Sequence, residues 1–458
     1  MLNLIKNEIY KILHKKGTFI VLAITALFMV FVSSLMLEDT NYMYPEIIYD
    51  TDLEDTLQNK INTEMNTLFK DYTTEDWQYY VTGDVYNVLN TYYANKENGI
   101  LDNATNKKYI EYKEALTSGN WKIFVEDQLL VAKNNLKDYQ EGLKLAKKDS
   151  EKKDYECMIF STNVEIEMLE YRLKENIPFG NDYLNVAINN INGNSYSVKS
   201  YEYGVNDEAI ESVKNAVKEY YENRYILENK EDINSGNLRH LIVNFYDNYI
   251  FLVLVFGIMI AGSIVSDEYN KGTIKSLLIT PYKRSTILLA KFITTILFTI
   301  FFIVIAYIMQ IVIGGLFLGF ESLTYKYIAY NLSSKSLEIM SLFKYVLINS
   351  VSLLPQILLL ITLAFAASTI IGNTAVAIVV TFAGVIGSTI VNVFALTYKI
   401  KVLKYFVTTN WNFNYYLFGG TSPYKTSLTH AIIVCIVYFL IMIVTTFIVF
   451  KKKNIKNI

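Results

Sequence analysis

The chain has 458 residues, of which 52% are hydrophobic and 19% are charged, and its formal net charge is −2. It is too apolar to be one soluble domain and too charged to lie entirely within a membrane. The charges are divided accordingly: residues 38–243 hold 38 acids against 22 bases, net −16, while the remainder holds 6 acids against 20 bases, net +14. The sequence therefore predicts an acidic domain joined to a basic, membrane-spanning part.

Residues 1–18 are predicted to form an amphipathic elbow helix at the membrane surface. Ile5, Ile9, Ile12 and Leu13 recur at helical spacing, and the lysines lie largely off this stripe, as in helices that lie in the membrane interface. Residues 19–37 follow without a charge and are long enough to span a bilayer. No convincing signal-peptide cleavage site follows them, so we expect an uncleaved first transmembrane helix.

Residues 38–243 contain no apolar run of spanning length, and their acidic composition agrees with a location outside the cell. Between residues 121 and 176 apolar side chains recur every seven positions, which is typical of helices that pack as in coiled coils. The polar tract 147–154 could instead fold this segment into a hairpin of two helices, and the pattern does not decide between them. We expect a mainly helical extracellular domain, in which the tyrosine-rich stretch 79–93 could be helix or strand.

Five further transmembrane helices are predicted within residues 244–450, and residues 451–458 form a basic cytoplasmic tail. The apolar runs are 245–265, 286–313, 345–370, 375–396 and 431–450. Six crossings put both termini in the cytoplasm, and the predicted fold is an all-α polytopic membrane protein with the helical domain inserted after the first span. Residues 398–429 would then be external although they carry four lysines and no acid. Re-entrant helices are the alternative for that segment.

A short basic loop, residues 266–285, joins the second and third predicted spans. Lysine and arginine outnumber acids in it, which predicts a cytoplasmic location. Within it, residues 273–280 make about two helical turns, with Ile274, Leu277 and Leu278 on one apolar face. A short helix of this kind can dock in a groove of another protein.

The order of residues in this loop resembles the coupling segment of type-2 ABC exporter permeases. In that family an acidic residue is followed by a basic residue with Gly-Thr, a Leu-Leu pair, a Thr-Pro pair, an Arg, and a Lys that opens the next span. The matching residues here are Glu268, Lys271, Gly272, Thr273, Leu277, Leu278, Thr280, Pro281, Arg284 and Lys291. The resemblance implies that Glu268, Lys271 and Arg284 hold the geometry of a docked ATPase. It also implies that Ile274, Leu277 and Leu278 supply buried contact with it.

The resemblance implies a permease subunit of an ATP-driven ABC exporter in a bacterial plasma membrane. Its partners would be two separate ATPase subunits and a second copy or a related permease, and its substrate a peptide, an antimicrobial, a drug or a lipid. No phosphate-binding P-loop occurs in the sequence, so the chain is not expected to hydrolyse ATP itself. No catalytic, cofactor-binding or metal-binding motif occurs either, and no nucleic-acid partner is expected.

Polar residues within the spans are candidates to line a translocation path. They are Gln310, Asn349, Gln356 and Asn392. The competing interpretation is a membrane sensor or mechanotransmission protein, whose extracellular domain detects a ligand and whose spans convey motion only.

Overall fold

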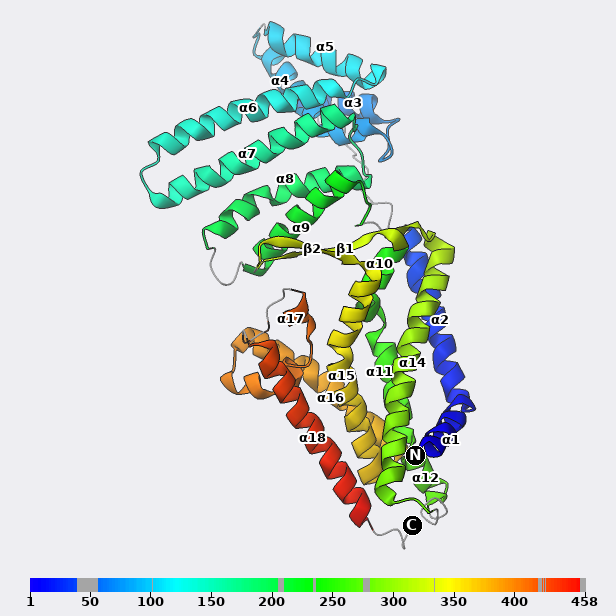
Figure 1. The fold of residues 1–458 in the computed structure, drawn as a ribbon. Coiled ribbons are helices and arrows are strands. Elements are labelled where there is room, and N and C mark those ends of the chain that lie inside the picture. Colours follow the sequence, from blue (N-terminus) through cyan, green and yellow to red (C-terminus); the bar gives the residue numbers. More distant parts are fainter. Residues whose placement is uncertain are drawn as a thin grey trace. The chain divides into compact units, whose positions relative to one another are not determined.

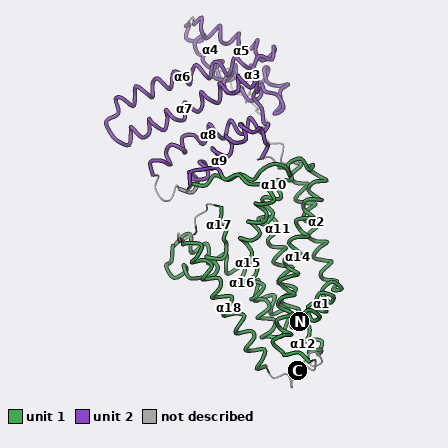
Figure 2. The backbone as a smooth tube through the Cα atoms, viewed as in Figure 1, with its two compact units in different colours: residues 1–40, 236–333, 338–458 green, residues 41–235, 334–337 purple. Residues whose placement is uncertain are grey.

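The computed structural model describes residues 1–38, 57–100, 102–204, 210–233, 236–274, 281–332, 334–418, 422, 424 and 426–453. The chain is an all-α polytopic membrane protein, as predicted, with one two-stranded sheet in the described part. It divides into two compact units (Figure 2). We call residues 1–40, 236–333 and 338–458 the membrane unit, and residues 41–235 and 334–337 the inserted domain.

Six described helices of the membrane unit are long and apolar enough to cross a bilayer, which confirms the six predicted spans (Figure 1). They are α2 (Lys16–Glu38), α11 (Phe245–Ser263), α14 (Arg284–Leu318), α15 (Leu342–Ile371), α16 (Thr374–Tyr398) and α18 (Leu428–Lys452). Helices suit this environment because they satisfy their own backbone hydrogen bonds. α14 is 35 residues long, which corresponds to about 52 Å. Because the hydrocarbon core is only ~30 Å thick, α14 must extend beyond it.

Capping residues set the turn between α15 and α16. Ser341 begins α15 by accepting a hydrogen bond from the backbone N–H of Lys344 at 3.3 Å. α15 ends at Gly372, whose φ of 78° lies in the left-handed region that favours glycine. Asn373 then begins α16 by accepting from the N–H of Val376 at 3.1 Å. The chain can therefore reverse direction within two residues, and α15 and α16 pack on each other.

α1 (Leu2–Leu13) precedes the first span and lies within the predicted elbow segment. Ile5 and Ile12 of the predicted apolar stripe are buried, but Leu13 is 42% exposed. The acidic residue Glu8 is buried instead. The face that packs against the rest of the chain therefore follows Ile5, Glu8 and Ile12, which share one side of the helix at i, i+3 and i+7.

The inserted domain is helical. Its described elements are α3 (Leu57–Phe69), η1 (Trp77–Val81), α4 (Thr82–Glu97), α5 (Asn103–Ser118), α6 (Lys122–Leu145), α7 (Asp149–Glu175), α8 (Tyr183–Glu202) and α9 (Ile210–Asn229). The tyrosine-rich stretch is helical, within η1 and α4. α6 and α7 pack on each other as a hairpin, so the chain adopts the second of the two alternatives (Figure 1). Gly142 permits their close approach, because a Cβ there would lie 2.5 Å from the Tyr155 ring.

The boundary of the inserted domain differs from the prediction, which extended to residue 243. The domain ends at residue 235, and α10 (Leu238–Val243) belongs to the membrane unit. Leu238 and Ile242 are buried in the core formed by the membrane helices. The six residues of α10 are too few to span a bilayer, so a search for apolar runs does not detect this helix.

Two connections between the later spans have structure of their own. η2 (Glu321–Thr324) and a sheet of β1 (Lys326–Asn331) and β2 (Ser336–Ser341) lie between α14 and α15, where no strand was predicted. η3 (Lys401–Tyr405), η4 (Val407–Thr409) and α17 (Asn414–Leu417) lie between α16 and α18. The N–H of Phe413 donates to the carbonyl of Ser352 at 3.2 Å, about 15 Å along α15. Trp411 is buried in the core of the membrane unit. This packing favours the re-entrant alternative for the segment.

Candidate functional site at the α12 junction

A polar site lies where α11 leads into the basic loop. It consists of Ser266, Asp267, Glu268 and Tyr269, which belong to the five-residue helix α12 (Ser266–Asn270). Asp267 is half-buried and the other three are buried. Figure 1 shows α12 at the same end of the membrane unit as α1. We call these four residues the α12 junction, because each contacts a different set of helix ends.

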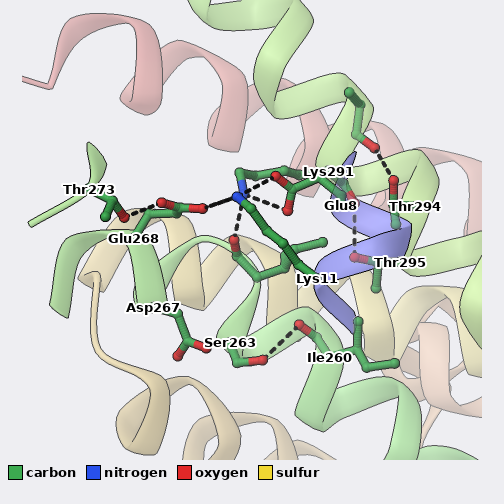
Figure 3. Close-up of polar contacts among 12 residues, drawn as sticks. Glu8, Lys11, Ile260, Ser263, Asp267, Glu268, Thr273, Lys291, Thr294 and Thr295 are labelled. Atoms are coloured by element: carbon green, nitrogen blue, oxygen red, sulfur yellow. Dashed lines mark hydrogen bonds and ion pairs between the residues drawn. The ribbon is translucent and has the colours of Figure 1, made fainter. Parts of the chain in front are cut away.

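Glu268 of the junction accepts contacts from three other segments (Figure 3). The Nζ of Lys291, in α14, lies 3.3 Å from its Oε1, and the Nζ of Lys11, in α1, lies 2.8 Å from the same oxygen. The hydroxyl of Thr273 donates to the second oxygen, Oε2. One carboxylate therefore connects α1, α14 and the start of the loop.

Lys291 lies at the centre of this buried charge. Its side chain is 3% exposed, and its ammonium group is 2.8 Å from Glu8 Oε2. It also donates to the backbone carbonyl of Ile264 at 3.0 Å. With Glu268, these acceptors match the three N–H donors of the ammonium group. A lysine can be buried in this way because its charge and its donors are all partnered.

The two lysines and two glutamates form a closed ring of alternating charge. Lys11 completes it by contacting Glu8 Oε1 at 3.1 Å, so that each lysine contacts both glutamates. The side chains of Glu8 and Glu268 are only 7% and 10% exposed. The ring carries no net charge, and alternation offsets the cost of removing Glu8, Glu268 and Lys291 from water, while Lys11 remains 43% exposed.

The ring shifts the pKa of Glu268 and of Lys11, which both lie outside the spans. Burial alone would raise the pKa of Glu268, but the charges of Lys291 and Lys11 and the hydrogen bond from Thr273 lower it to about 2. For Lys11, burial alone would lower the pKa, whereas its hydrogen bonds and attraction to Glu268 and Glu8 raise it above its usual value. Both groups therefore remain charged at neutral pH.

Ser266 and Asp267 connect the junction to three more helix ends. Lys15, directly before α2, lies 2.9 Å from Asp267 Oδ2. Thr374, the first residue of α16, donates its hydroxyl to Asp267 Oδ1 at 3.2 Å and lies 2.6 Å from Ser266 Oγ. The N–H of Ser266 donates to Ser368 Oγ of α15 at 3.1 Å.

Tyr269 extends the junction to the last span. The Nζ of Lys453, directly after α18, lies 4.5 Å from the centroid of the Tyr269 ring, a cation–π contact. The same Nζ donates to the carbonyl of Ile370 at 2.9 Å, where the C-terminal end of α15 favours a positive charge. The junction thus continues α11 and contacts residues in, or next to, the ends of the other five spans.

The predicted ATPase-coupling residues that the structure describes form an exposed group and a buried group. Leu277, Leu278 and most of the predicted helix 273–280 lie outside the described residues. The exposed group comprises Lys271, Gly272, Thr273, Pro281 and Arg284. Glu268 and Ile274 are buried within the chain.

One of those expectations needs correction. Ile274 is 1% exposed and belongs to the chain's own core, so it does not present its side chain to a partner. Glu268 is bound within the chain by Lys11, Lys291 and Thr273, and its predicted role in ATPase docking stays a prediction. Their position in the loop predicts a role for Ile274 and Glu268. The direction of each side chain, however, depends on helices that are distant in the sequence.

The structure does not join the four candidates for a translocation path by hydrogen bonds. Gln310 is buried in α14, and its Nε2 lies 3.5 Å from Ser33 Oγ of α2. Asn349 is buried in α15 and accepts a hydrogen bond from Asn414 Nδ2 at 2.9 Å. Gln356 and Asn392 are half-buried in α15 and α16. Asn349 therefore binds the segment before the last span.

Glu8 is a site residue that the sequence analysis missed. Only six acids lie outside residues 38–243, and three of them, Glu8, Asp267 and Glu268, lie in or contact the α12 junction and its lysine partners. A lone acid on the apolar face of a basic helix costs free energy unless it is paired. The sequence contains this signal, but it does not identify the partner of Glu8, because Lys291 lies 283 residues away.

Comparison with known proteins is consistent with a membrane protein. The chain is 27% identical over 247 residues to "Uncharacterized protein YhcI" of Bacillus subtilis (strain 168), covering 54% of this chain and 79% of that protein. It is 29% identical over 211 residues to "Uncharacterized membrane protein YdbK" of the same organism, covering 45% of this chain and 78% of that protein. No solved structure matches the chain significantly. The model of a family described as "Protein of unknown function (DUF2705)" matches residues 210–456, which include the α12 junction and Lys291. The chain therefore belongs to the DUF2705 family.

Proposed function

We propose that this chain is the membrane-spanning permease subunit of an ATP-driven ABC exporter, and that separate ATPase subunits dock on the loop after α12. The observation that carries the proposal is the α12 junction. The loop whose sequence resembles a coupling segment begins at a helix whose residues contact residues in, or next to, the ends of five other spans. A force applied to this loop would reach the whole membrane unit.

The ion-pair ring explains how such a force would be transmitted. Glu268 is bound to Lys11 in α1 and to Lys291 in α14, so α12 cannot move alone without separating buried opposite charges. Separating such charges costs several kcal/mol. Movement of α1, α12 and α14 together costs less, which favours a rigid-body tilt of the spans over local distortion of the loop.

The charge distribution supports a specific orientation in a bacterial plasma membrane. The loop and the tail after α18 are basic, and short basic segments are retained in the cytoplasm. The inserted domain would then lie outside the cell, and both termini inside. Because the sequence contains no P-loop, ATP hydrolysis would belong to the partner. The complex would contain a second copy of this chain or a related permease, and would export a peptide, an antimicrobial, a drug or a lipid.

Co-purification of an ATPase with the tagged chain tests this proposal. Leu277→Asp should abolish co-purification while leaving membrane insertion intact, because an unpaired charge buried in a docking face costs several kcal/mol. Asn3→Asp is the matched control, since it adds the same charge at an exposed position of α1, outside the loop. Equal recovery of the ATPase with wild type and Leu277→Asp would contradict the docking assignment.

The second candidate function, a sensor, is favoured by one observation. The inserted domain is a compact unit with hydrophobic clusters of its own, as a separate ligand-binding domain would be. Sealed vesicles that carry the complex distinguish the two functions. An exporter accumulates a candidate peptide, drug or lipid on addition of ATP. A sensor moves none of them, yet its ATPase activity or signalling still responds to a ligand of the inserted domain.

A further inference from the structure

A cavity of about 700 Å³ lies within the membrane unit between α1, the start of α2 and the α11–α12 segment. This volume is within the range of roughly 300–1,000 Å³ that small-molecule sites occupy. One end is apolar and includes Val21, Phe256 and Met259. The other end is charged and includes Lys15 and Lys271. The cavity is therefore amphipathic along its length.

The charged end has an excess of positive charge. The lysines on and behind its wall are Lys11, Lys15, Lys271 and Lys291, and the acids are Glu8, Asp267 and Glu268. Four lysines against three acids leave one net positive charge. The three acids are each paired with a lysine. Lys271 is exposed and makes no ion pair within the described residues, so its ammonium group is free to bind an anion.

The position of the cavity matches the boundary between lipid headgroups and acyl chains. α1 is an amphipathic helix directly before a span, as in helices that lie in the membrane interface. The apolar end follows α2 and α11, which are spans, toward the hydrocarbon. Basic pockets at such boundaries bind the headgroups of anionic lipids.

We propose that this cavity binds one anionic glycerophospholipid, with its phosphate near Lys15 and Lys271 and an acyl chain along Val21, Phe256 and Met259. One phosphodiester neutralises the single excess positive charge. The apolar end makes a free phosphate a poor occupant, because that end would remain unfilled. The bound lipid would hold α1 against α11 beside the ion-pair ring. The inference does not depend on the proposed function.

Native mass spectrometry of the full chain, purified in detergent and stripped of lipid, tests the inference. After addition of phosphatidylglycerol, we expect one molecule to remain per chain. Phosphatidylcholine, which has no net charge, should bind roughly tenfold more weakly, and inorganic phosphate should not be retained. Equal retention of the two lipids, or several phosphatidylglycerol molecules without a preferred first one, would overturn the proposal.

Two variants locate the lipid. Lys271→Gln should weaken phosphatidylglycerol binding roughly tenfold by removing the unpaired charge. Gly17→Phe should block the cavity, because only the Met259 side chain, at 3.9 Å, lies within 4 Å of a Cβ placed at Gly17. The matched controls are Lys6→Gln, on the exposed side of α1, and Ile24→Phe, at a 50% exposed position of α2 outside the cavity.

The controls should retain phosphatidylglycerol as wild type does. Loss of binding in Lys6→Gln equal to that in Lys271→Gln would indicate general attraction to the basic surface and would refute a defined site. A melting curve of each variant identifies any that is misfolded. The comparison of lipids on the wild-type chain decides the question even if a cavity variant fails to fold.

Discussion

Replacement of Lys291 by methionine is the most direct perturbation of the ion-pair ring. Methionine keeps a long side chain and removes the charge. In wild type the ammonium group lies 2.8 Å from Glu8, 3.3 Å from Glu268 and 3.0 Å from the carbonyl of Ile264. In the variant, two buried carboxylates would share one lysine, Lys11, and one backbone carbonyl would lose its donor.

The geometry gives the expected magnitude. At an effective dielectric constant of about 20, the attractions across 2.8 and 3.3 Å are about 6 and about 5 kcal/mol, and much of this offsets the cost of burying the ions. Loss of one partner of a buried ion pair costs roughly 3–5 kcal/mol. The lowered pKa of Glu268 points in the same direction, because the charge of Lys291 is the largest of the contributions that lower it. We therefore expect Lys291→Met to reduce the free energy of unfolding by about 3 kcal/mol or more.

Thermal unfolding in detergent at several pH values measures this loss. A lowered carboxyl pKa stabilises the fold fully above pH 4.5, and the stabilisation disappears as the pH falls toward 2. In Lys291→Met the pKa of Glu268 should rise, because burial is no longer opposed by Lys291. The variant should therefore differ most from wild type above pH 4.5, and the difference should narrow as the pH falls from 4.5 toward 2.

Lys283→Met is the matched control, because Lys283 is exposed directly before α14. It should unfold as wild type does. Adding Glu8→Gln to Lys291→Met should restore part of the stability, since one of the two buried carboxylates then becomes neutral. An unfolding midpoint for Lys291→Met that equals that of Lys283→Met at pH 7 would refute the structural role of the ring.

Three further outcomes are expected. In a background without the two native cysteines, a cysteine at Ser118 should react with an impermeant reagent in intact cells and one at Ser276 only after lysis; equal labelling would reject the proposed orientation. Asn349→Leu should lower the free energy of unfolding by roughly 1–3 kcal/mol, because the Asn414 amide loses a buried acceptor. If the variant instead unfolds as wild type does but transports less substrate, Asn349 acts as a residue of the translocation path. Lys453→Met should lower the free energy of unfolding by about 1 kcal/mol in the same assay, because its contacts with Ile370 and Tyr269 are lost. An unchanged free energy of unfolding would mean that the contact between Tyr269 and Lys453 does not connect α12 to the last span.

The sequence by itself determined the six spans and the helical nature of the insert. Apolar runs of about 20 residues have few alternatives to a membrane helix, because lipid cannot satisfy an irregular backbone. The turn between α15 and α16 was also local, since it depends on Gly372 and Asn373, which are adjacent in the chain. The loop could be recognised for the same reason, as its pattern lies within about 26 residues.

Only the tertiary structure decided whether residues 121–176 form one continuous helix or a hairpin of two, and which charged side chains form ion pairs. The seven-residue period fits both a continuous helix and the α6–α7 hairpin, because the period describes a face and not the partner of that face. Likewise, α10 and the segment before α18 lack a spanning apolar run, and their place follows from packing against α15 and its neighbours. The ring of Glu8, Lys11, Glu268 and Lys291 brings together residues up to 283 positions apart. Electrostatic pairing depends on distance in space, and that distance exists only once the helices have packed.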